Sequence, residues 1–334
     1  MGAKTKIAAA MLAAGVLAAL QPAMLPGSDV SRAGAAAAPK VWGIGGIKDK
    51  TAVQGLEAKV GRQFGAVRVF LLWNATFPTS YHTWLATTGR TPLISLRAQR
   101  GDGSLVSWQA IADAAPGSTL HTQVTTWADK IKAYGVPVRF TFNHEPEAKD
   151  SAGNGTAAAY IAAWQKVITI FRARGVTNAK FLWIMTANAF RVGSGDRRFA
   201  IKWYPGDGYV DELGTDVYND YTCRATSDSP WYPLTTEIER FRQFGAARPT
   251  KPMWLAEWAS TEDPQNSNRK AQWITEAREA LKAPAYDQII GVLYFHKYRP
   301  GTPCTWYVDS TPASLSAFSA MGADPVYSGR ITSG

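Results

Sequence analysis

The sequence is poor in the residues that build metal centres and disulfide frameworks, with only four histidines and two cysteines among 334 residues. A site made of several histidines and a small cysteine-rich scaffold are therefore both excluded. Charged residues are also scarce at 19%, while 46% of the chain is hydrophobic, which excludes a disordered tail or a long coiled coil. After residue 20 no apolar run approaches the roughly 20 residues that a membrane helix needs. The composition predicts a folded globular protein.

Three common catalytic motifs are missing as well. His144 is the only histidine followed by Glu, but Ala148 stands where the zinc peptidase motif requires a second histidine, and Pro146 breaks the helix. No strand is followed by the Gly-x-Ser-x-Gly elbow of serine hydrolases. The glycine cluster at 43–46 lacks the spacing of a dinucleotide-binding loop. We therefore expect neither a metal nor a cofactor.

The formal net charge of +10 invites a nucleic-acid interpretation. The basic residues are scattered singly, however, and the densest groups are only Arg197-Arg198 and the pair Lys130 and Lys132. Scattered charge is typical of a solvated surface, so we expect no nucleic-acid partner. Tryptophan, tyrosine and phenylalanine are plentiful at 13 each. This number of tryptophans indicates a surface that stacks on ring-shaped ligands.

The first 38 residues have the pattern of a secretory leader. Lys4 and Lys6 precede an apolar run at 7–20, and small residues follow up to Ala38. Cleavage near Ala23 and cleavage near Ala38 both fit. Removal of residues 1–38 takes away three basic residues and one acidic residue and leaves a net charge of +8. We expect a secreted, extracellular protein that has no membrane association after cleavage and is a monomer.

Export changes the interpretation of the two cysteines. Cys223 and Cys304 are 81 positions apart, and an even pair in an oxidising compartment is a candidate disulfide. A loop of that length gives about 4–5 kcal/mol in the chain-entropy model, which is an upper estimate. The alternative is two unpaired thiols.

Residues 39–334 alternate apolar strands with helices. The strands expected are 41–47, 66–73, 92–98, 136–144, 180–187, 210–218, 252–258 and 289–296. The helices expected are 53–62, 120–134, 157–174, 234–244, 269–281 and 313–321. Continuous apolar strands that alternate with helices indicate a parallel sheet, and eight repeats favour a closed (β/α)8 TIM barrel over an open sheet. No linker interrupts this region, which predicts a single α/β catalytic domain.

Two of these strands end in a lone glutamate. The strand at 136–144 leads into Glu145, and the strand at 252–258 carries Glu257 near its end. The working residues of a (β/α)8 barrel lie at the carboxyl ends of its strands. An unpaired buried carboxylate is costly, so stability alone does not call for these residues. Two glutamates that face one cavity are a natural acid and nucleophile for cleaving a glycosidic bond. The alternative is that each is an ion-paired residue of the barrel rim.

Several segments resemble glycoside hydrolase family 26 of clan A, whose best-known members are β-mannanases. They are Asn143-His144-Glu145-Pro146, the block at 203–219 that contains Gly214-Thr215-Asp216-Val217-Tyr218-Asn219, Trp254-Leu255-Ala256-Glu257, and the tail at 294–296 and 306–315. The resemblance covers residues 40–322, and the block at 203–219 is its most specific part.

The resemblance implies a role for each matching position. Glu145 would be the general acid/base and Glu257 the nucleophile of a retaining reaction, with carboxyl groups about 5–5.5 Å apart. His144 and Asn143 would contact the sugar or orient the acid. Tyr218 would donate its hydroxyl to Glu257, which favours the ionised nucleophile.

Further residues complete the predicted sugar site. Asp216 would bind a sugar hydroxyl, and His296 lies in the matching tail. Arg68 stands inside an apolar strand, so we expect it to pair with Glu257, and Arg139 should pair with another buried carboxylate. Five tryptophans at strand ends or in loops are candidates for stacking on sugar rings: Trp73, Trp203, Trp231, Trp258 and Trp306.

The sequence therefore predicts a secreted, retaining endo-β-glycosidase whose partner is a polysaccharide, with β-1,4-mannan as the first expected substrate. The stretch after Glu145 and the end of the last strand differ from typical mannanases: residues 146–150 replace a tryptophan-rich cluster, and Tyr294-Phe295-His296-Lys297 replaces a Trp-Phe pair with an arginine nearby. The alternatives are β-1,3-xylan or mixed-linkage β-glucan as substrate, or a barrel that binds a polysaccharide without cleaving it.

Overall fold

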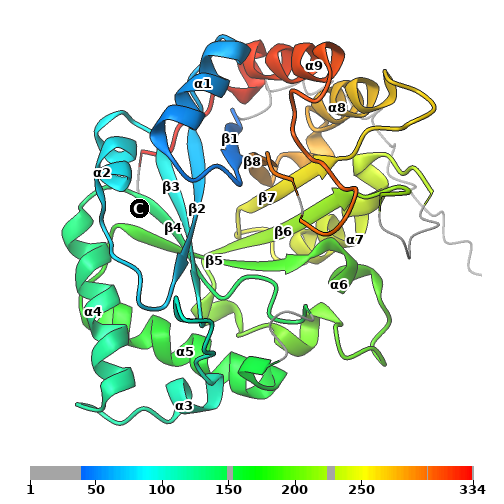
Figure 1. The fold of residues 1–334 in the computed structure, drawn as a ribbon. Coiled ribbons are helices and arrows are strands. Elements are labelled where there is room, and N and C mark those ends of the chain that lie inside the picture. The colour runs from blue at the N-terminus through cyan, green and yellow to red at the C-terminus, as the bar shows by residue number, and fades with distance from the viewer. Residues whose placement is uncertain (1–38, 149–152, 224–229, 299, 333–334) are drawn as a thin grey trace, which may run out of the picture. The chain divides into compact units, whose positions relative to one another are not determined.

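The computed structural model describes residues 39–148, 153–223, 230–298 and 300–332, so the predicted leader at 1–38 lies outside the described residues. Within this part of the chain, eight parallel strands form a closed barrel in the order of the sequence (Figure 1). The strands are β1 (Val41–Gly45), β2 (Ala66–Leu72), β3 (Thr91–Arg97), β4 (Val138–Phe142), β5 (Ala179–Thr186), β6 (Glu212–Asn219), β7 (Met253–Ser260) and β8 (Ile289–Phe295). The prediction of a (β/α)8 barrel is confirmed.

Helices cover the outside of the barrel. They are α1 (Lys50–Val60), α2 (Ser80–Thr87), α3 (Trp108–Ala112), α4 (Thr119–Tyr134), α5 (Ala157–Ala173), α6 (Ala187–Arg191), α7 (Leu234–Ala246), α8 (Arg269–Ala280) and α9 (Pro312–Ala323). Short 3₁₀ helices occur at Ala200–Trp203, Asp207–Tyr209, Pro284–Tyr286 and Pro325–Tyr327. The six helices expected from the sequence are present. The sequence does not predict α2, α3 and α6, because five to eight residues are too few to show a helical period.

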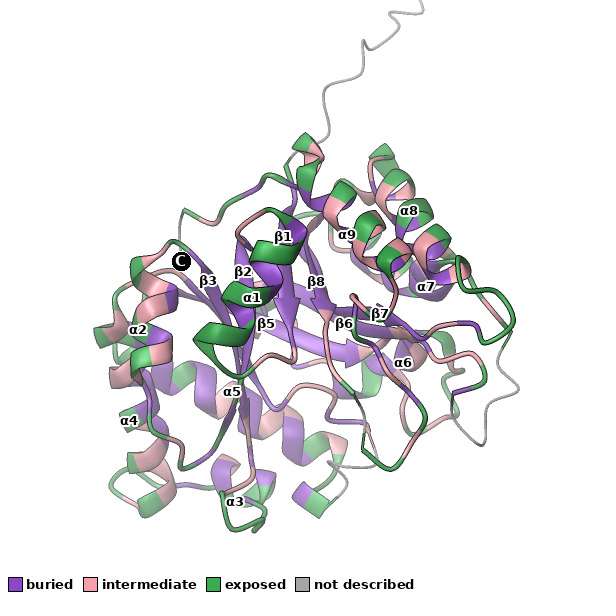
Figure 2. Ribbon diagram, turned by 45° about the horizontal axis from the view of Figure 1, so that its top comes forward, coloured by how far each residue is buried: buried purple, intermediate pink, exposed green. Residues whose placement is uncertain are grey.

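The core has two layers, and the strands between them are buried on both faces (Figure 2). One cluster lies between the sheet and the helices, where the ring of Trp42 is 4.7 Å from those of Phe64 and Phe318. The other lies inside the barrel and includes Leu182, Trp254 and Leu293. Strand alternation produces this division, because successive side chains of a strand point to opposite faces.

A buried ion pair crosses the barrel interior below the mouth. Arg139 on β4 lies 2.9 Å from Glu212 on β6, and the indole nitrogen of Trp254 donates a hydrogen bond to the same carboxylate at 2.7 Å. Gly291 on β8 makes room for that indole, since a Cβ there would lie 2.2 Å from the ring. The predicted pairing of Arg139 with a buried carboxylate is confirmed.

Cys223 and Cys304 form a disulfide bond, as predicted. It joins the loop after β6 to the loop after β8, and both loops lie at the carboxyl ends of the strands. None of the helices that the structure describes is long and apolar enough to cross a membrane.

Candidate active site

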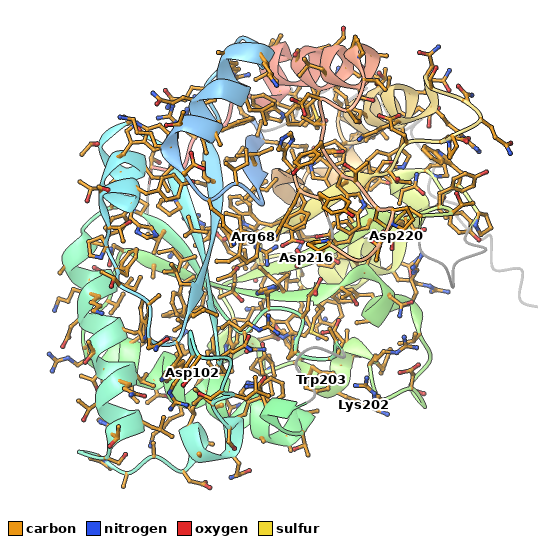
Figure 3. The ribbon with its side chains drawn as sticks, viewed as in Figure 1. Arg68, Asp102, Lys202, Trp203, Asp216 and Asp220 are labelled. Atoms are coloured by element: carbon orange, nitrogen blue, oxygen red, sulfur yellow. A yellow bond between two sulfur atoms is a disulfide. The ribbon has the colours of Figure 1, made fainter. Side chains whose placement is uncertain are left out.

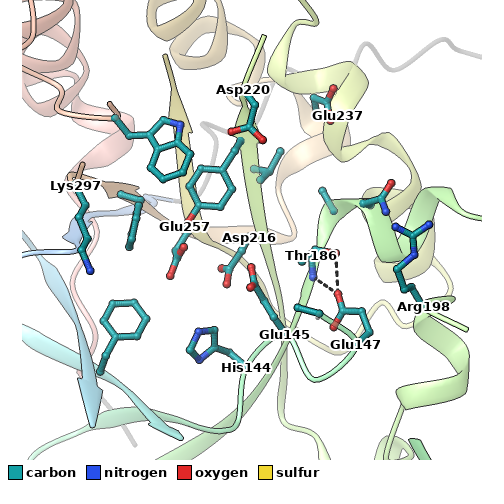
Figure 4. A pocket seen from close by; sticks show the side chains of 18 of the residues that line it. His144, Glu145, Glu147, Thr186, Arg198, Asp216, Asp220, Glu237, Glu257 and Lys297 are labelled. Atoms are coloured by element: carbon teal, nitrogen blue, oxygen red, sulfur yellow. Dashed lines mark hydrogen bonds between the residues drawn. The ribbon is translucent and has the colours of Figure 1, made fainter. Parts of the chain in front are cut away.

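A cavity of about 780 Å³ opens at the carboxyl ends of the strands. Its walls include Glu145 after β4, Asp216 on β6 and Glu257 on β7, whose carboxyl groups point toward one another (Figure 4). The register between β6 and β7 shifts at Thr215 and Asp216, so that Asp216 lies opposite Glu257. The structure therefore brings both glutamates of the sequence prediction into one cavity, with a third carboxyl between them.

The turn that carries Glu145 is held in an uncommon backbone conformation. Asn143 and Glu145 both have φ of 49°, the left-handed region, which costs on the order of 1–3 kcal/mol for a residue other than glycine. The backbone nitrogen of Asn143 donates to Leu96 at 2.7 Å, and that of Glu145 donates to Ile184 at 3.0 Å. Hydrogen bonds to β3 and β5 thus fix the direction of the Glu145 side chain.

Asn143 does not line the cavity, which corrects its predicted role in sugar binding. Its side chain is buried and its Oδ1 accepts a hydrogen bond from the backbone nitrogen of Ala98 at 3.0 Å. Asn143 therefore stabilises the turn between β4 and the acid.

Arg68 pairs with two of the three carboxyls. Its Nη1 lies 2.7 Å from Asp216 and 2.9 Å from Glu257, and its guanidinium is fully buried. Figure 3 shows Arg68 and Asp216 side by side in the middle of the barrel. The predicted contact between Arg68 and Glu257 is confirmed, and Asp216 is the second partner. Although burial opposes it, the two carboxylates raise the pKa of Arg68, so the guanidinium stays charged.

The surroundings of Glu145 favour its protonated form. Burial raises the pKa of Glu145 well above its usual value, and the charges of Asp216, Glu257 and Glu147 raise it further. Burial also raises the pKa of Glu257 well above its usual value, but the direct contact with Arg68 opposes that rise. A hydrogen bond joins Glu145 to Asp216, and it stabilises the ionised form of Asp216. The arrangement suits a protonated Glu145 beside an ionised Glu257.

Tyr218 and His144 were predicted to contact the catalytic carboxyls or the sugar. Among the described residues, no hydrogen bond joins Tyr218 to Glu257, so Arg68 rather than the tyrosine hydroxyl contacts this carboxylate. Tyr218 does line the cavity, with its ring 4.7 Å from that of Trp306. His144 also lines it, and burial together with nearby arginines lowers its pKa well below the usual value. The His144 ring is therefore neutral.

Of the five predicted tryptophans and His296, only Trp306 lines the cavity. Trp258 is fully buried and stacks on Trp273 of α8. Trp73 is also buried, and its ring lies 6.2 Å from that of Phe142. The remaining three also pack away from the cavity: Trp203 against Trp108 and Tyr160, Trp231 under Arg269, and His296 against Tyr307 and Asp309. Figure 3 shows Trp203 far from Arg68 and Asp216. These residues are structural, which corrects their predicted role in sugar binding.

Two phenylalanines that were not predicted as site residues line the cavity. Phe70 on β2 is 40% exposed and its ring lies 6.3 Å from that of Phe295 at the end of β8. Phe70 follows Arg68 by two positions, so both point to the interior face of the barrel. That alternation was the available signal, because Arg68 was already expected to face the carboxylates.

Two charged residues of the wall were also not assigned a role. Lys297 follows β8 and points into the cavity, and Glu147 lies in the same turn as Glu145 (Figure 4). Neither belongs to a strand, so no periodicity predicted its direction.

Among the residues that the structure describes, two groups have the spacing of metal ligands. The ligand atoms of His144, Glu145 and Asp216 lie within 4.8 Å of one another, and Asp220 lies near the two cysteines. The cysteines are joined in a disulfide and offer no thiolate. Asp216 is already paired with the positive charge of Arg68, and the surroundings of Glu145 favour its protonated form. The first group is better suited to a hydrogen-bonded acid than to a cation.

Comparison with known proteins agrees with this geometry. The profile described as Glycosyl hydrolase family 26 matches residues 118–251, a segment that contains Glu145 and Asp216. A curated protein from Acetivibrio thermocellus, named Endoglucanase H, is 29% identical over 292 residues. The chain is therefore similar to glycosyl hydrolase family 26, and the profile match lies within the barrel. The resemblance in the sequence is thereby confirmed. The match covers 84% of this chain but only 30% of Endoglucanase H, so the chain spans about a third of that relative.

Solved structures of family 26 share the fold. An endo-β-1,4-mannanase double mutant from Cellulomonas fimi is 18% identical, with a TM-score of 0.63 and coverage of 86% of this chain and 71% of that chain. The catalytic domain of an endo-β-1,4-mannanase from Bacillus sp. JAMB-750 is also 18% identical, with a TM-score of 0.62 and coverage of 86% of both chains. Identities this low establish the common barrel and leave the substrate open.

Proposed function

We propose that the chain is a retaining endo-β-glycanase in which Glu145 is the acid/base and Glu257 the nucleophile. The observation that carries this proposal is that the two glutamates of one cavity have different charged neighbours. Arg68 lies 2.9 Å from Glu257 and favours its ionised form, while burial and three neighbouring carboxylates favour a proton on Glu145. Groups whose environments separate their pKa values in this way are suited to opposite roles.

The reaction follows from these charge states. Glu257 attacks the anomeric carbon while Glu145 gives its proton to the glycosidic oxygen, so the leaving sugar departs as a neutral alcohol. A covalent glycosyl ester on Glu257 results. Glu145, now ionised, takes a proton from a water molecule that attacks the same carbon, and Glu257 leaves as a carboxylate. Arg68 stabilises the charge of Glu257 before the first step and after the second.

The shape of the cleft supports action inside a polymer. A second hollow of about 560 Å³ adjoins the first and shares Phe70, Arg97, His144, Phe295 and Lys297 with it. The two hollows together offer room for several sugar residues on the β2 and β8 side of the carboxyls. Phe70 and Phe295 present aromatic rings there, and the CH faces of sugars pack on such rings.

The relatives favour β-glucan over mannan as the substrate. The 29% identical relative carries the name endoglucanase, whereas the proteins named mannanases are solved structures at 14–18% identity. We therefore propose a β-glucan, including mixed-linkage β-glucan, as the first candidate. The β-1,4-mannan expected from the sequence is the second candidate, because the proteins of similar fold are named mannanases.

A panel of polymers tests the function. We expect the protein to release reducing ends from mixed-linkage β-glucan at least about tenfold faster than from galactomannan or β-1,3-xylan, since substrate hydroxyls that lack partners cost binding energy. The viscosity of the polymer should fall early, as expected for internal cleavage. Faster cleavage of galactomannan would show that mannan, and not β-glucan, is the preferred substrate. If the protein is retained on immobilised glucan but cleaves no polymer, its function is to bind a polysaccharide and not to hydrolyse it.

The dependence of kcat/KM on pH should be bell-shaped, with both limbs above pH 4.5. Activity is lost at low pH when Glu257 gains a proton and at high pH when Glu145 loses one. Burial raises the pKa of both residues above the ordinary value of 4.5, so both limbs move up. Initial rates on a soluble oligosaccharide in constant-ionic-strength buffers measure the profile. A maximum below pH 4.5 would contradict the assigned roles.

We also propose that residues 1–38 direct export. The disulfide between Cys223 and Cys304 supports this, because such bonds persist in oxidising compartments. The intact mass of the protein recovered from the culture medium tests the proposal, and a protein that stays in the cytosol at full length would refute it.

A further inference from the structure

Glu147 is a buried carboxyl that the reaction described above does not use. It lies two residues after Glu145 in the turn between β4 and α5, and only 1% of its surface is exposed. Figure 4 shows it beside Thr186 and Arg198 at the wall of the cavity. A buried acid next to a catalytic acid requires an explanation, because burying a carboxyl without a cation is costly.

The two oxygens of Glu147 have different surroundings. Oε1 accepts two hydrogen bonds from Thr186, at 2.8 Å from the backbone nitrogen and at 2.7 Å from the hydroxyl. Oε2 is buried and has no hydrogen-bond partner among the described residues. When the carboxyl carries a proton, it therefore sits on Oε2, where the neutral form removes the cost of an unsolvated charge.

These contacts connect the Glu145 turn to β5. Thr186 is the last residue of β5 and caps the first turn of α6, since its hydroxyl accepts from Ala189 at 3.3 Å. On the other side, Arg197 donates to the backbone oxygen of Glu147 at 3.1 Å. The turn, which already contains a left-handed Glu145, is thus fixed at its far end by Glu147.

The charge of Glu147 acts on its neighbours. Burial raises its pKa to about 7, against the hydrogen bonds from Thr186. Its ionised form in turn raises the pKa of Glu145. The titratable and charged groups that face it are Glu145 of the same turn, Asp216 on β6, Tyr160 on α5, and Arg197 and Arg198 after α6.

We propose that Glu147 is a positioning residue that holds the Glu145 turn against β5 and whose ionisation extends the pH range over which Glu145 keeps its proton. The second half of this statement rests on the proposed role of Glu145 as the acid. The first half concerns stability and is independent of any activity.

The stability test compares Glu147→Gln with the wild type between pH 5 and pH 8. Glutamine keeps an oxygen for Thr186 but cannot ionise. A group whose folded pKa of about 7 exceeds its unfolded value of 4.5 costs the wild type stability increasingly above pH 4.5. The melting temperature of Glu147→Gln minus that of the wild type should therefore rise with pH, by on the order of 5 °C. Glu276→Gln, on an exposed position of α8, is the matched control and should show a constant difference.

The kinetic test follows the alkaline limb of kcat/KM. In Glu147→Gln this limb should move to lower pH by about one unit, because the charge that helps Glu145 keep its proton is gone. A role limited to packing would not move the limb. If no glycan is cleaved, the proposed function fails, and the melting temperatures still decide whether Glu147 ionises in place.

A second pair of variants covers the case in which Glu147→Gln fails to fold. Thr186→Val removes the hydroxyl that stabilises ionised Glu147, whereas Thr186→Ser keeps it. The melting temperature of the valine variant relative to the serine variant should fall from pH 5 to pH 8. A difference that is independent of pH in both pairs, or an alkaline limb that does not move in Glu147→Gln, would overturn the proposal.

Discussion

Replacing Glu257 by Gln is expected to lower kcat by at least about 10⁴-fold, because the proposed covalent step would lose its nucleophile. The folded structure should persist, since Arg68 keeps Asp216 as a partner at 2.7 Å. Single-turnover and steady-state rates on the preferred glycan measure the loss, and circular dichroism confirms the fold. Azide added to Glu257→Ala with an activated aryl glycoside should restore turnover and give a glycosyl azide of inverted configuration.

Glu237→Gln is the matched control, because Glu237 lines the same cavity but pairs with Arg191. This variant should retain activity within about an order of magnitude. If Glu257→Gln is nearly as active as the wild type, Glu257 is not the nucleophile. An azide product of retained configuration would contradict the role of Glu257, because it requires a glycosyl-enzyme intermediate formed on another carboxylate.

Replacing Arg68 by Met is expected to destabilise the fold by about 3–5 kcal/mol, because Asp216 and Glu257 would remain buried without their cation. The acid limb of the pH profile should also move to higher pH. Arg68 favours the ionised form of Glu257, so its removal raises the pKa of that carboxyl and leaves it protonated over a wider range. Denaturant unfolding at pH 7 and the pH dependence of kcat/KM measure the two effects.

Arg139→Met separates these effects. Arg139 makes another buried ion pair, with Glu212 at 2.9 Å, inside the barrel and below the cavity. Its loss should cost a similar amount of stability and leave the acid limb in place. An Arg68→Met variant as stable as the wild type, or an equal movement of the limb in both variants, would contradict the role assigned to Arg68.

The strands and the two glutamates could be predicted from the sequence because both depend on local pattern. Apolar runs of five to eight residues define the strands, and a carboxyl at the end of such a run has few explanations other than a site. The observed strands differ from the expected ones by about two residues at the ends, as for 136–144 against Val138–Phe142. There the chain leaves the strand to form the left-handed turn at Asn143 and Glu145.

Strand alternation explains only one of the tryptophans that do not face the cavity: Trp73 is out of phase with Arg68 and Phe70. On β7 the inner side chain of Trp254 would by alternation place Trp258 inside the barrel as well, but an irregularity in the pairing of β7 with β6 and β8 reverses the phase. Glu257 therefore faces the cavity and Trp258 points outward to α8. The alternation rule would have found Phe70. Alternation does not reach Glu147 or Lys297, which lie in loops whose direction depends on tertiary hydrogen bonds such as those from Thr186. Those contacts join residues 39 positions apart, so no local sequence pattern predicts them.

The disulfide between Cys223 and Cys304 also affects the wall of the cleft. It fastens the loop that carries Trp306 to the loop that follows Tyr218, and the two rings lie 4.7 Å apart. Ordering a loop on binding consumes part of the interaction energy, and a covalent tie supplies that order before any sugar arrives. The aromatic wall of this cleft is therefore preorganised by oxidation, so the affinity for a glycan is set partly when the protein matures.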